Sequence, residues 1–103
     1  MLFTDTDESG RAVGYAICFR QTVEDDGIAV GRRELYVDDL CVDRAVRKTG
    51  VGSRLVRHVR QYAKDEGFDW ITLNVWNGND TALAFYRKME LNARKTTLEE
   101  RVD

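Results

Sequence analysis

The sequence predicts a single α+β domain over residues 1–103, in which a mixed, mostly antiparallel sheet is flanked by two helices. Three observations support this fold class: apolar strand-like segments separated by turn residues fill the first 43 positions, an amphipathic segment begins at residue 51, and a further strand and helix follow it. A chain of this length can bury one two-layer core but not two. We therefore expect a meander followed by a β-α-β-α-β order.

The first half of the chain is predicted to form a three-stranded antiparallel meander. Residues 1–6 are predicted as the first strand, and the Asp-Glu-Ser-Gly turn at residues 7–10 leads into a second strand from about residue 11 to 23. The Asp-Asp-Gly sequence at residues 25–27 predicts a hairpin turn, because an Asp-Gly pair tolerates the positive φ values of a two-residue connection. The third strand is predicted from about residue 33 to 43.

A long amphipathic helix is predicted next, with Gly67 as its C-terminal stop. Its apolar residues recur with the 3.6-residue period of an α-helix: Val51, Leu55, Val56, Val59, Tyr62 and Ala63. Residues 70–76 then alternate, with Ile71, Leu73 and Val75 on one face, which predicts a strand. A strand, helix and strand of these lengths make a right-handed parallel crossover.

A second helix and a final strand complete the prediction. The Asn-Gly-Asn-Asp sequence at residues 77–80 ends the preceding strand, and either Asn79 or Asp80 can cap a helix. That helix carries the apolar residues Ala82, Leu83, Phe85, Tyr86 and Met89. The final strand is predicted from about residue 93 to 101.

Positive charge is concentrated in one short part of the chain, although the formal net charge is −2. Residues 44–64 contain seven basic residues and no acidic residue. A solvated helix face is one explanation for such a run, but this run surrounds a possible phosphate-binding loop, which favours a functional role. A nucleic-acid-binding domain is less favoured, because the overall charge is negative and basic and aromatic residues do not interleave.

Other features narrow the expected setting of the protein. Cys18 and Cys41 lack a metal-binding or redox spacing, and no metal site is predicted. No segment is long enough to span a membrane or has the pattern of a signal peptide. We therefore expect a reduced, cytoplasmic setting without a membrane partner.

The most informative segment is the glycine loop, which we define as residues 47–52 (Arg-Lys-Thr-Gly-Val-Gly), between a predicted strand and a predicted helix. Gly50 and Gly52 allow positive φ values and a close approach of the backbone to a ligand. The first turn of the helix has N–H groups without intrahelical partners, and the helix dipole places about half a positive charge there. This end of the helix favours an anion such as a pyrophosphate.

Two motifs, in this order along the chain, resemble the signatures of the GCN5-related N-acetyltransferase (GNAT) superfamily. The glycine loop matches the acyl-CoA signature of Arg or Gln, two residues, Gly, one residue, and Gly or Ala. Residues 79–86 match a second signature, in which Asn, two residues and Ala precede an aromatic pair. The resemblance implies an enzyme that transfers an acetyl group from acetyl-CoA to a primary amine of a small molecule or peptide by direct attack, without a metal. The alternative is a non-catalytic acyl-CoA-binding or regulatory module.

The resemblance also implies which residues bind the co-substrate acetyl-CoA. Backbone groups of Leu40, Cys41 and Val42 would pair with the pantetheine arm in a gap between two strands. The alternative is that these three residues are simply part of the buried core. The side chains of Arg47, Lys48 and Arg54 would supply positive charge to the pyrophosphate. Backbone N–H groups would cradle it, and these belong to Arg47, Lys48, Thr49, Gly50, Val51, Gly52 and Ser53. Asn79 would bond the end of the pantetheine, or it would serve only as a helix cap.

Tyr86 is implied as the general acid that protonates the departing thiolate of CoA. A phenol suits this step because its pKa is similar to that of a thiol, and a positioned proton donor can raise the rate by roughly 10²- to 10⁴-fold. On periodicity alone, a core aromatic position beside Phe85 fits Tyr86 better. The register of Asn79, Ala82 and Tyr86 in the second signature favours the catalytic role.

The attacking amine also needs a base, and the sequence offers three carboxylates near the expected site: Glu34, Asp38 and Asp39. The segment around them loosely resembles the acidic strand of the polyamine acetyltransferases in this superfamily. Strand alternation places Asp38 and Asp39 on opposite faces unless a bulge re-aims one of them. We favour Asp38, and a solvated or salt-bridged carboxylate is the alternative for each residue.

The sequence departs from the family pattern at three places. Lys48 and Glu90 stand where the family has glycine. Because a non-glycine residue at positive φ costs about 1 kcal/mol or more, we expect the last helix to run two residues further and to use Asn92 as its cap. The family's usual first strand and two helices have no counterpart before Met1. Their absence would leave a sheet edge and apolar surface open, so we expect a homodimer in which a second copy supplies this wall.

Overall fold

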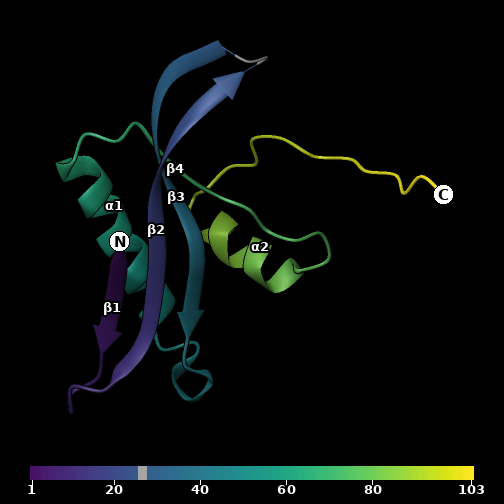
Figure 1. The fold of residues 1–103 in the computed structure, drawn as a ribbon. Coiled ribbons are helices and arrows are strands. Elements are labelled where there is room, and N and C mark those ends of the chain that lie inside the picture. The colour runs from purple at the N-terminus through teal and green to yellow at the C-terminus, as the bar shows by residue number, and fades with distance from the viewer. Residues whose placement is uncertain (26–27) are drawn as a thin grey trace.

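The computed structural model describes residues 1–25 and 28–103, and in these residues it contains a four-stranded sheet and two α-helices. In chain order the elements are β1 (Leu2–Thr6), β2 (Ala12–Asp25), β3 (Ile28–Val42), the 3₁₀ helix η1 (Arg44–Val46), α1 (Val51–Asp65), β4 (Trp70–Leu73) and α2 (Asp80–Lys88). The strands lie side by side in the order β1-β2-β3-β4 (Figure 1). The predicted α+β class with a mixed sheet is confirmed.

The first three strands form the predicted antiparallel meander. β1 pairs with β2 from Leu2 opposite Ile17, and β2 pairs with β3 as far as Asp25 opposite Ile28. The predicted hairpin turn falls on residues 26–27, which lie outside the described residues. β3 begins earlier than predicted, because its pairing with β2 continues to the end of the described ladder.

α1 connects β3 to the parallel strand β4 and packs on one face of the sheet. It buries the predicted apolar stripe, with Val51, Leu55, Val56, Val59 and Ala63 as its buried residues. Gly14 of β2 allows close packing, because an added Cβ there would lie 2.8 Å from Val51 Cγ1 and 3.0 Å from Leu55 Cδ1. The N-terminal end of α1 is therefore held directly against the sheet.

α1 ends at the predicted glycine. Gly67 takes a φ of 73°, and the N–H of Phe68 donates to the carbonyl of Ala63 at 2.9 Å. This hydrogen bond across a left-handed residue is the Schellman arrangement, which satisfies carbonyl groups at the helix end. Phe68 also packs near Tyr62 of the last turns, with ring centroids 6.3 Å apart.

α2 ends earlier than predicted. Glu90 takes a φ of 69°, and the N–H of Leu91 donates to the carbonyl of Tyr86 at 3.0 Å, as in the Schellman arrangement after α1. The expectation that the helix continues to a cap at Asn92 is therefore wrong. The hydrogen bonds of this motif offset the cost of placing a non-glycine residue in the left-handed region.

The predicted final strand at residues 93–101 does not form, and residues 89–103 contain no strand. β4 ends at Leu73 rather than at the predicted residue 76, so it offers few backbone partners to a further strand. The segment also has little apolar surface to bury: Leu98 and Val102 are 89% and 90% exposed. In Figure 1 this segment, drawn in yellow, extends away from the sheet.

Glu34 of β3 is a buried charged residue that ties several elements together. Its side chain is 1% exposed, and its Oε1 atom lies 2.9 Å from Arg32 Nη2 and 2.8 Å from Arg94 Nη1. The guanidinium of Arg32 also lies over the ring of Trp70, 4.3 Å from its centroid. Glu34, one of the three carboxylates considered as a base, is thus part of an ion cluster that joins β3, β4 and the C-terminal segment.

Among the described residues, neither helix combines the length and the apolar character that crossing a bilayer requires.

Candidate active site

The sheet opens into a gap between β3 and β4. Parallel pairing covers only four residue pairs, from Glu34 with Trp70 to Val37 with Leu73. β3 continues to Val42, and among the described residues no strand pairs with this edge of residues 38–42. A free strand edge of this kind can receive an extended ligand as an additional strand. The predicted pantetheine-binding residues Leu40, Cys41 and Val42 all lie along it.

The glycine loop runs from η1 into α1 and takes a tightly turned conformation. Lys48 and Gly50 have φ values of 67° and 91°, so Lys48 takes the left-handed conformation that the family gives to glycine. Gly50 is the N-cap of α1 and provides no side-chain cap. The first amides of the helix have no intrahelical partner, and they therefore form the kind of donor set that binds an anion.

Gly52 differs from its predicted role. It lies inside the first turn of α1 and does not take a positive φ. An added Cβ would lie 3.1 Å from Phe85 Cζ and 3.8 Å from Val42 Cγ2. The absence of a side chain at Gly52 therefore lets α2 and the end of β3 pack against the start of α1, which closes one end of the gap.

Asn79 is the N-cap of α2. Its Oδ1 atom accepts a hydrogen bond of 3.2 Å from the backbone N–H of Ala82. The capping role that the sequence left as an alternative is therefore present. The side chain is exposed, and its binding to pantetheine stays a prediction.

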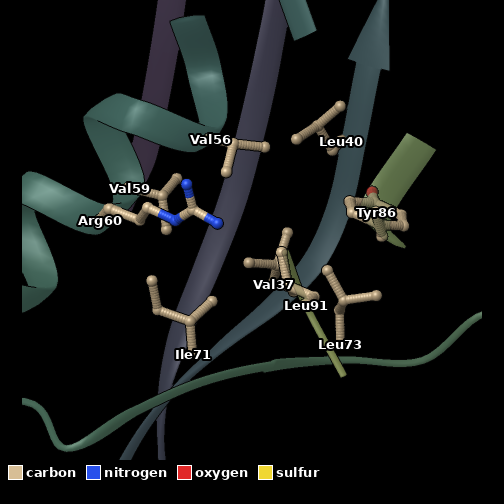
Figure 2. Close-up of a pocket in the computed structure, with 9 residues that line it drawn as sticks. All are labelled: Val37, Leu40, Val56, Val59, Arg60, Ile71, Leu73, Tyr86 and Leu91. Carbon is tan, nitrogen blue, oxygen red and sulfur yellow. The ribbon is translucent and has the colours of Figure 1, made fainter. Parts of the chain in front are cut away.

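Tyr86 of α2 faces a cavity of about 50 Å³ beside the gap (Figure 2). The lining comes from β3, α1, β4, α2 and the turn after α2: Val37, Leu40, Val56, Val59, Arg60, Ile71, Leu73, Tyr86 and Leu91. Burial raises the pKa of Tyr86, and the negative charge of Asp39 raises it further. The phenol therefore stays protonated at neutral pH and can donate a proton into the cavity.

Arg60 is a residue of this cavity that the sequence did not single out. Its guanidinium extends from α1 into the cavity, as Figure 2 shows, and it donates a hydrogen bond to the backbone carbonyl of Met89 at the C-terminal end of α2. Arg60 thereby links α1 to the C-terminal end of α2, the helix that carries Tyr86. The run of basic residues at positions 44–64 does not indicate which of them forms such a link.

A β-bulge interrupts β3 at Asp38. Two consecutive residues of β2 pair with Val37 and Asp39, which leaves Asp38 without a partner on β2. Val37 and Leu40 consequently both line the cavity, although they are three positions apart. Asp38 and Asp39, which lie between Val37 and Leu40, are both exposed. The alternation of buried and exposed side chains along the strand is therefore broken at the bulge.

Asp39 is connected to two tyrosines on different elements. Its Oδ2 atom accepts a hydrogen bond of 2.9 Å from the hydroxyl of Tyr15 on β2, and this bond raises the pKa of Tyr15. Its charge also contributes to the raised pKa of Tyr86. The sequence could not indicate this pairing, because Tyr15 and Asp39 are 24 residues apart and meet only through the register of two strands.

The basic residues of the loop differ in their surroundings. Arg47 and Lys48 are exposed, and neither forms an ion pair with any residue that the structure describes. Arg54, in contrast, forms an ion pair of 2.9 Å with Asp5 of β1. Within residues 1–25 and 28–103, no three His, Cys, Asp or Glu side chains gather closely enough to hold a metal ion.

Comparison with known structures shows the same fold in other proteins. A mutant of the BH1408 protein from Bacillus halodurans is 28% identical, with a TM-score of 0.88, and the match covers 98% of this chain and 64% of that one. An aminoglycoside N-acetyltransferase solved in complex with CoA is 15% identical, with a TM-score of 0.81, 99% of this chain covered and 75% of that one. A third, the aminoglycoside acetyltransferase meta-AAC0020 from an uncultured soil metagenomic sample, in complex with sisomicin, is 22% identical, with a TM-score of 0.78 and coverages of 99% and 64%. The two aminoglycoside enzymes support the fold alone.

The chain thus spans 64% of the length of the Bacillus halodurans protein. The family of this chain is shown by a sequence model: the model of the acetyltransferase (GNAT) family matches residues 1–90. This match includes both signatures, the glycine loop and residues 79–86. The chain belongs to the GNAT family of acetyltransferases.

Proposed function

We propose that the protein is an acyl-CoA-dependent N-acetyltransferase, which transfers the acetyl group of acetyl-CoA to a primary amine by direct attack. The single observation that carries this proposal is the gap beside β3, because it places a free strand edge between the N-terminus of α1 and the phenol of Tyr86. A bound CoA in one structure of the same fold supports the choice of co-substrate.

In this proposal, acetyl-CoA lies along the gap with its diphosphate at the glycine loop. The backbone N–H groups of Arg47 and Thr49 already donate to the carbonyls of Arg44 and Val46, so those of Lys48 and residues 50–53 bind the diphosphate. The exposed side chains of Arg47 and Lys48 neutralise its charge. The pantetheine arm pairs with Leu40, Cys41 and Val42 as an added strand. Asn79 borders the far end of this path.

The reaction needs one bond to form and one to break. The nitrogen of the acceptor attacks the thioester carbonyl carbon, and the tetrahedral intermediate collapses with cleavage of the carbon–sulfur bond. The thiolate of CoA leaves and takes the proton of the Tyr86 hydroxyl. A raised pKa suits this role, because the phenol is then protonated whenever the thiolate departs.

The two carboxylates of the bulge have separate roles in the proposal. Asp38 accepts the proton that the attacking amine loses, directly or through a water molecule. Asp39 is already bonded to Tyr15, and its negative charge attracts a protonated amine to the gap. The exposure of both side chains supports access from solvent.

A cationic amine is the acceptor class that we propose. The first 43 residues, which contribute β1, β2 and β3, contain ten acidic and four basic residues, so this part of the molecule attracts cations. Two neighbours of the same fold are aminoglycoside acetyltransferases. An aminoglycoside, a polyamine and a lysine-containing peptide therefore form the first panel of candidate acceptors.

Release of free CoA separates an enzyme from a binding module. Both would bind acetyl-CoA in a calorimeter, but only an enzyme would release free thiol when the amine panel is added. Binding without thiol release from any amine in the panel would favour the non-catalytic module. An absence of acetyl-CoA binding would contradict both readings.

We also propose a homodimer, in which a second copy covers the sheet face opposite α1. Leu2 and Phe19 are 64% and 51% exposed, and they alternate with residues that face α1. β1 is also an edge strand, so its outer backbone groups can pair with another chain. Light scattering at micromolar concentration is expected to give the mass of a dimer, and a monomer would contradict the proposal.

A further inference from the structure

An ion pair joins the first strand of the protein to the helix that begins at the glycine loop. Asp5 of β1 accepts a hydrogen bond from Nε of Arg54 on α1, with 2.9 Å between Nε and Oδ2. The Asp5 side chain is 14% exposed and that of Arg54 is 46% exposed, so the carboxylate is held within the fold while the guanidinium reaches the surface. The two residues are 49 positions apart in the chain.

The ion pair fixes the direction of the Arg54 side chain. Because Asp5 bonds to Nε, the two terminal amino groups of the guanidinium remain available for another acceptor. One of them, Nη1, lies 3.6 Å from the position that a Cβ on Gly50 would occupy. The guanidinium is therefore turned back toward the N-cap of α1, where the first amides of the helix have no intrahelical partner.

This position is electrostatically unfavourable for a cation in the free protein. The N-terminal end of a helix carries partial positive charge, and α1 has no acidic residue in its first turn. The negative charge nearest to Arg54 in the ion pair comes from Asp5, which lies on β1 rather than on α1 and contacts Nε of the guanidinium. A bound anion in front of Gly50 would complete the neutralisation.

We infer that Asp5 is a positioning residue for the diphosphate of acyl-CoA: it holds Arg54 so that both terminal amino groups face the anion bound at the glycine loop. This inference rests on the proposed function. A fork of two parallel N–H donors suits a phosphate, and less entropy is lost on binding when the fork is already oriented.

Two effects of removing the Asp5 charge have opposite signs, which makes the inference testable. A carboxylate that acted only through its charge would repel the diphosphate, so its removal would strengthen binding. A carboxylate that positions Arg54 would, when removed, leave the guanidinium free to rotate, so binding would weaken. We expect Asp5→Ala, which removes both the charge and the acceptor of the Arg54 hydrogen bond, to raise the Kd for CoA by about 5- to 10-fold, the size of one ordinary hydrogen bond.

A double-mutant cycle with Arg54→Gln tests whether Asp5 acts through Arg54. Calorimetric titration with CoA is expected to show weaker binding for each single variant, and no further loss when Asp5→Ala is added to Arg54→Gln. Asp65→Ala is the matched control, because it removes one carboxylate and one side-chain hydrogen bond at the opposite end of the same helix. It is expected to leave the Kd unchanged.

A shortened acetyl donor distinguishes a variant in which Arg54 is no longer positioned from a variant that is simply less well folded. Acetyl-pantetheine lacks the diphosphate, so Asp5→Ala should lower kcat/KM for acetyl-CoA and leave kcat/KM for acetyl-pantetheine unchanged. Equal losses with both donors would mean that Asp5 only stabilises the fold, and unchanged or tighter CoA binding would mean that it only contributes charge. Either result would overturn the inference while leaving the proposed function intact. If the unmodified protein does not bind CoA, the proposed function itself fails.

Discussion

A carboxylate of β3 and a phenol of α2 are coupled across the candidate site: burial raises the pKa of Tyr86, and the negative charge of Asp39 raises it further. The bulge at Asp38 makes this coupling possible, because it leaves both Asp38 and Asp39 outside the core. A strand that contributes backbone groups to the proposed cofactor path thus also helps to keep the proposed acid protonated.

The first prediction concerns the pH dependence of the reaction. Asp39→Asn removes the charge that adds to the effect of burial, so the pKa of Tyr86 should fall toward its ordinary value. The alkaline limb of the kcat profile, which reports the loss of the proposed acid, should then move to lower pH. Asp38→Asn is the comparison, because it should lower kcat without moving this limb. An alkaline limb that stays in place in Asp39→Asn would contradict the coupling.

The same shift has a consequence for stability. A tyrosine whose pKa is raised by folding contributes stability that is complete below the pKa of the unfolded chain, near 10, and is lost as the pH rises through the folded-state pKa. The free energy of unfolding should therefore fall as the pH rises above about 10, by less in Tyr86→Phe than in the unmodified protein. Urea titrations at several pH values would measure the difference.

Tyr86→Phe is the direct test of the proposed acid. We expect kcat to fall by roughly 100-fold or more, because a positioned proton donor is lost, while the Kd for acetyl-CoA changes little. Tyr62→Phe is the matched control, since Tyr62 packs on α1 between Phe3 and Phe68, outside the cavity. Loss of both binding and turnover in Tyr86→Phe would indicate a packing role instead.

Gly50→Ala tests the N-terminus of α1 as the anion site. The alanine would be strained at a φ of 91°, and it would obstruct the approach of a diphosphate to the first amides of the helix. Gly10→Ala is a close control, because Gly10 has a φ of 85° and lies in a turn with open space around it. Both variants should lose about 1 to 2 kcal/mol of stability, but only Gly50→Ala should bind acetyl-CoA more weakly. Equal affinities would count against the site.

Sequence reasoning succeeded where the relevant signal is local. The apolar stripe of α1 and its stop at Gly67 follow from periodicity and from the preference of glycine for the left-handed region. The Asn79 cap follows from a side chain that bonds a backbone amide only three residues away. In each case the residues that decide the structure are neighbours in the chain.

It failed where the structure depends on residues that meet only after folding. The bulge at Asp38 is a property of the register between β2 and β3, and the sequence of β3 alone does not locate it. Gly52 has its place in the glycine signature, but its contact with Phe85 depends on how α2 docks. The short β4 likewise removes the partner that the predicted final strand required.

The positive φ of Glu90 can be tested directly, because a non-glycine residue in this conformation carries a free-energy cost. Glu90→Gly should stabilise the protein by about 1 kcal/mol, because glycine takes the observed φ of 69° without the penalty of a side chain. Glu90→Ala is the control, since it removes the carboxylate but retains the penalty, and it should change stability much less. The midpoint of urea unfolding measures both variants. A gain in Glu90→Ala as large as that in Glu90→Gly would assign the effect to charge instead.

Glu34 provides the last prediction, because it is the buried anion that two guanidinium groups share. Glu34→Gln is expected to destabilise the fold by about 3 to 5 kcal/mol, since it leaves the half-buried Arg32 without its counter-ion. Arg94→Gln removes the other partner, whose side chain is 42% exposed, so its loss should cost no more than about 1 kcal/mol. Urea unfolding of the two variants measures this difference, with CoA binding followed in parallel because Glu34 lies outside the proposed cofactor path. Equal and small losses in the two variants would show that the cluster behaves as an ordinary surface ion pair rather than as a buried one.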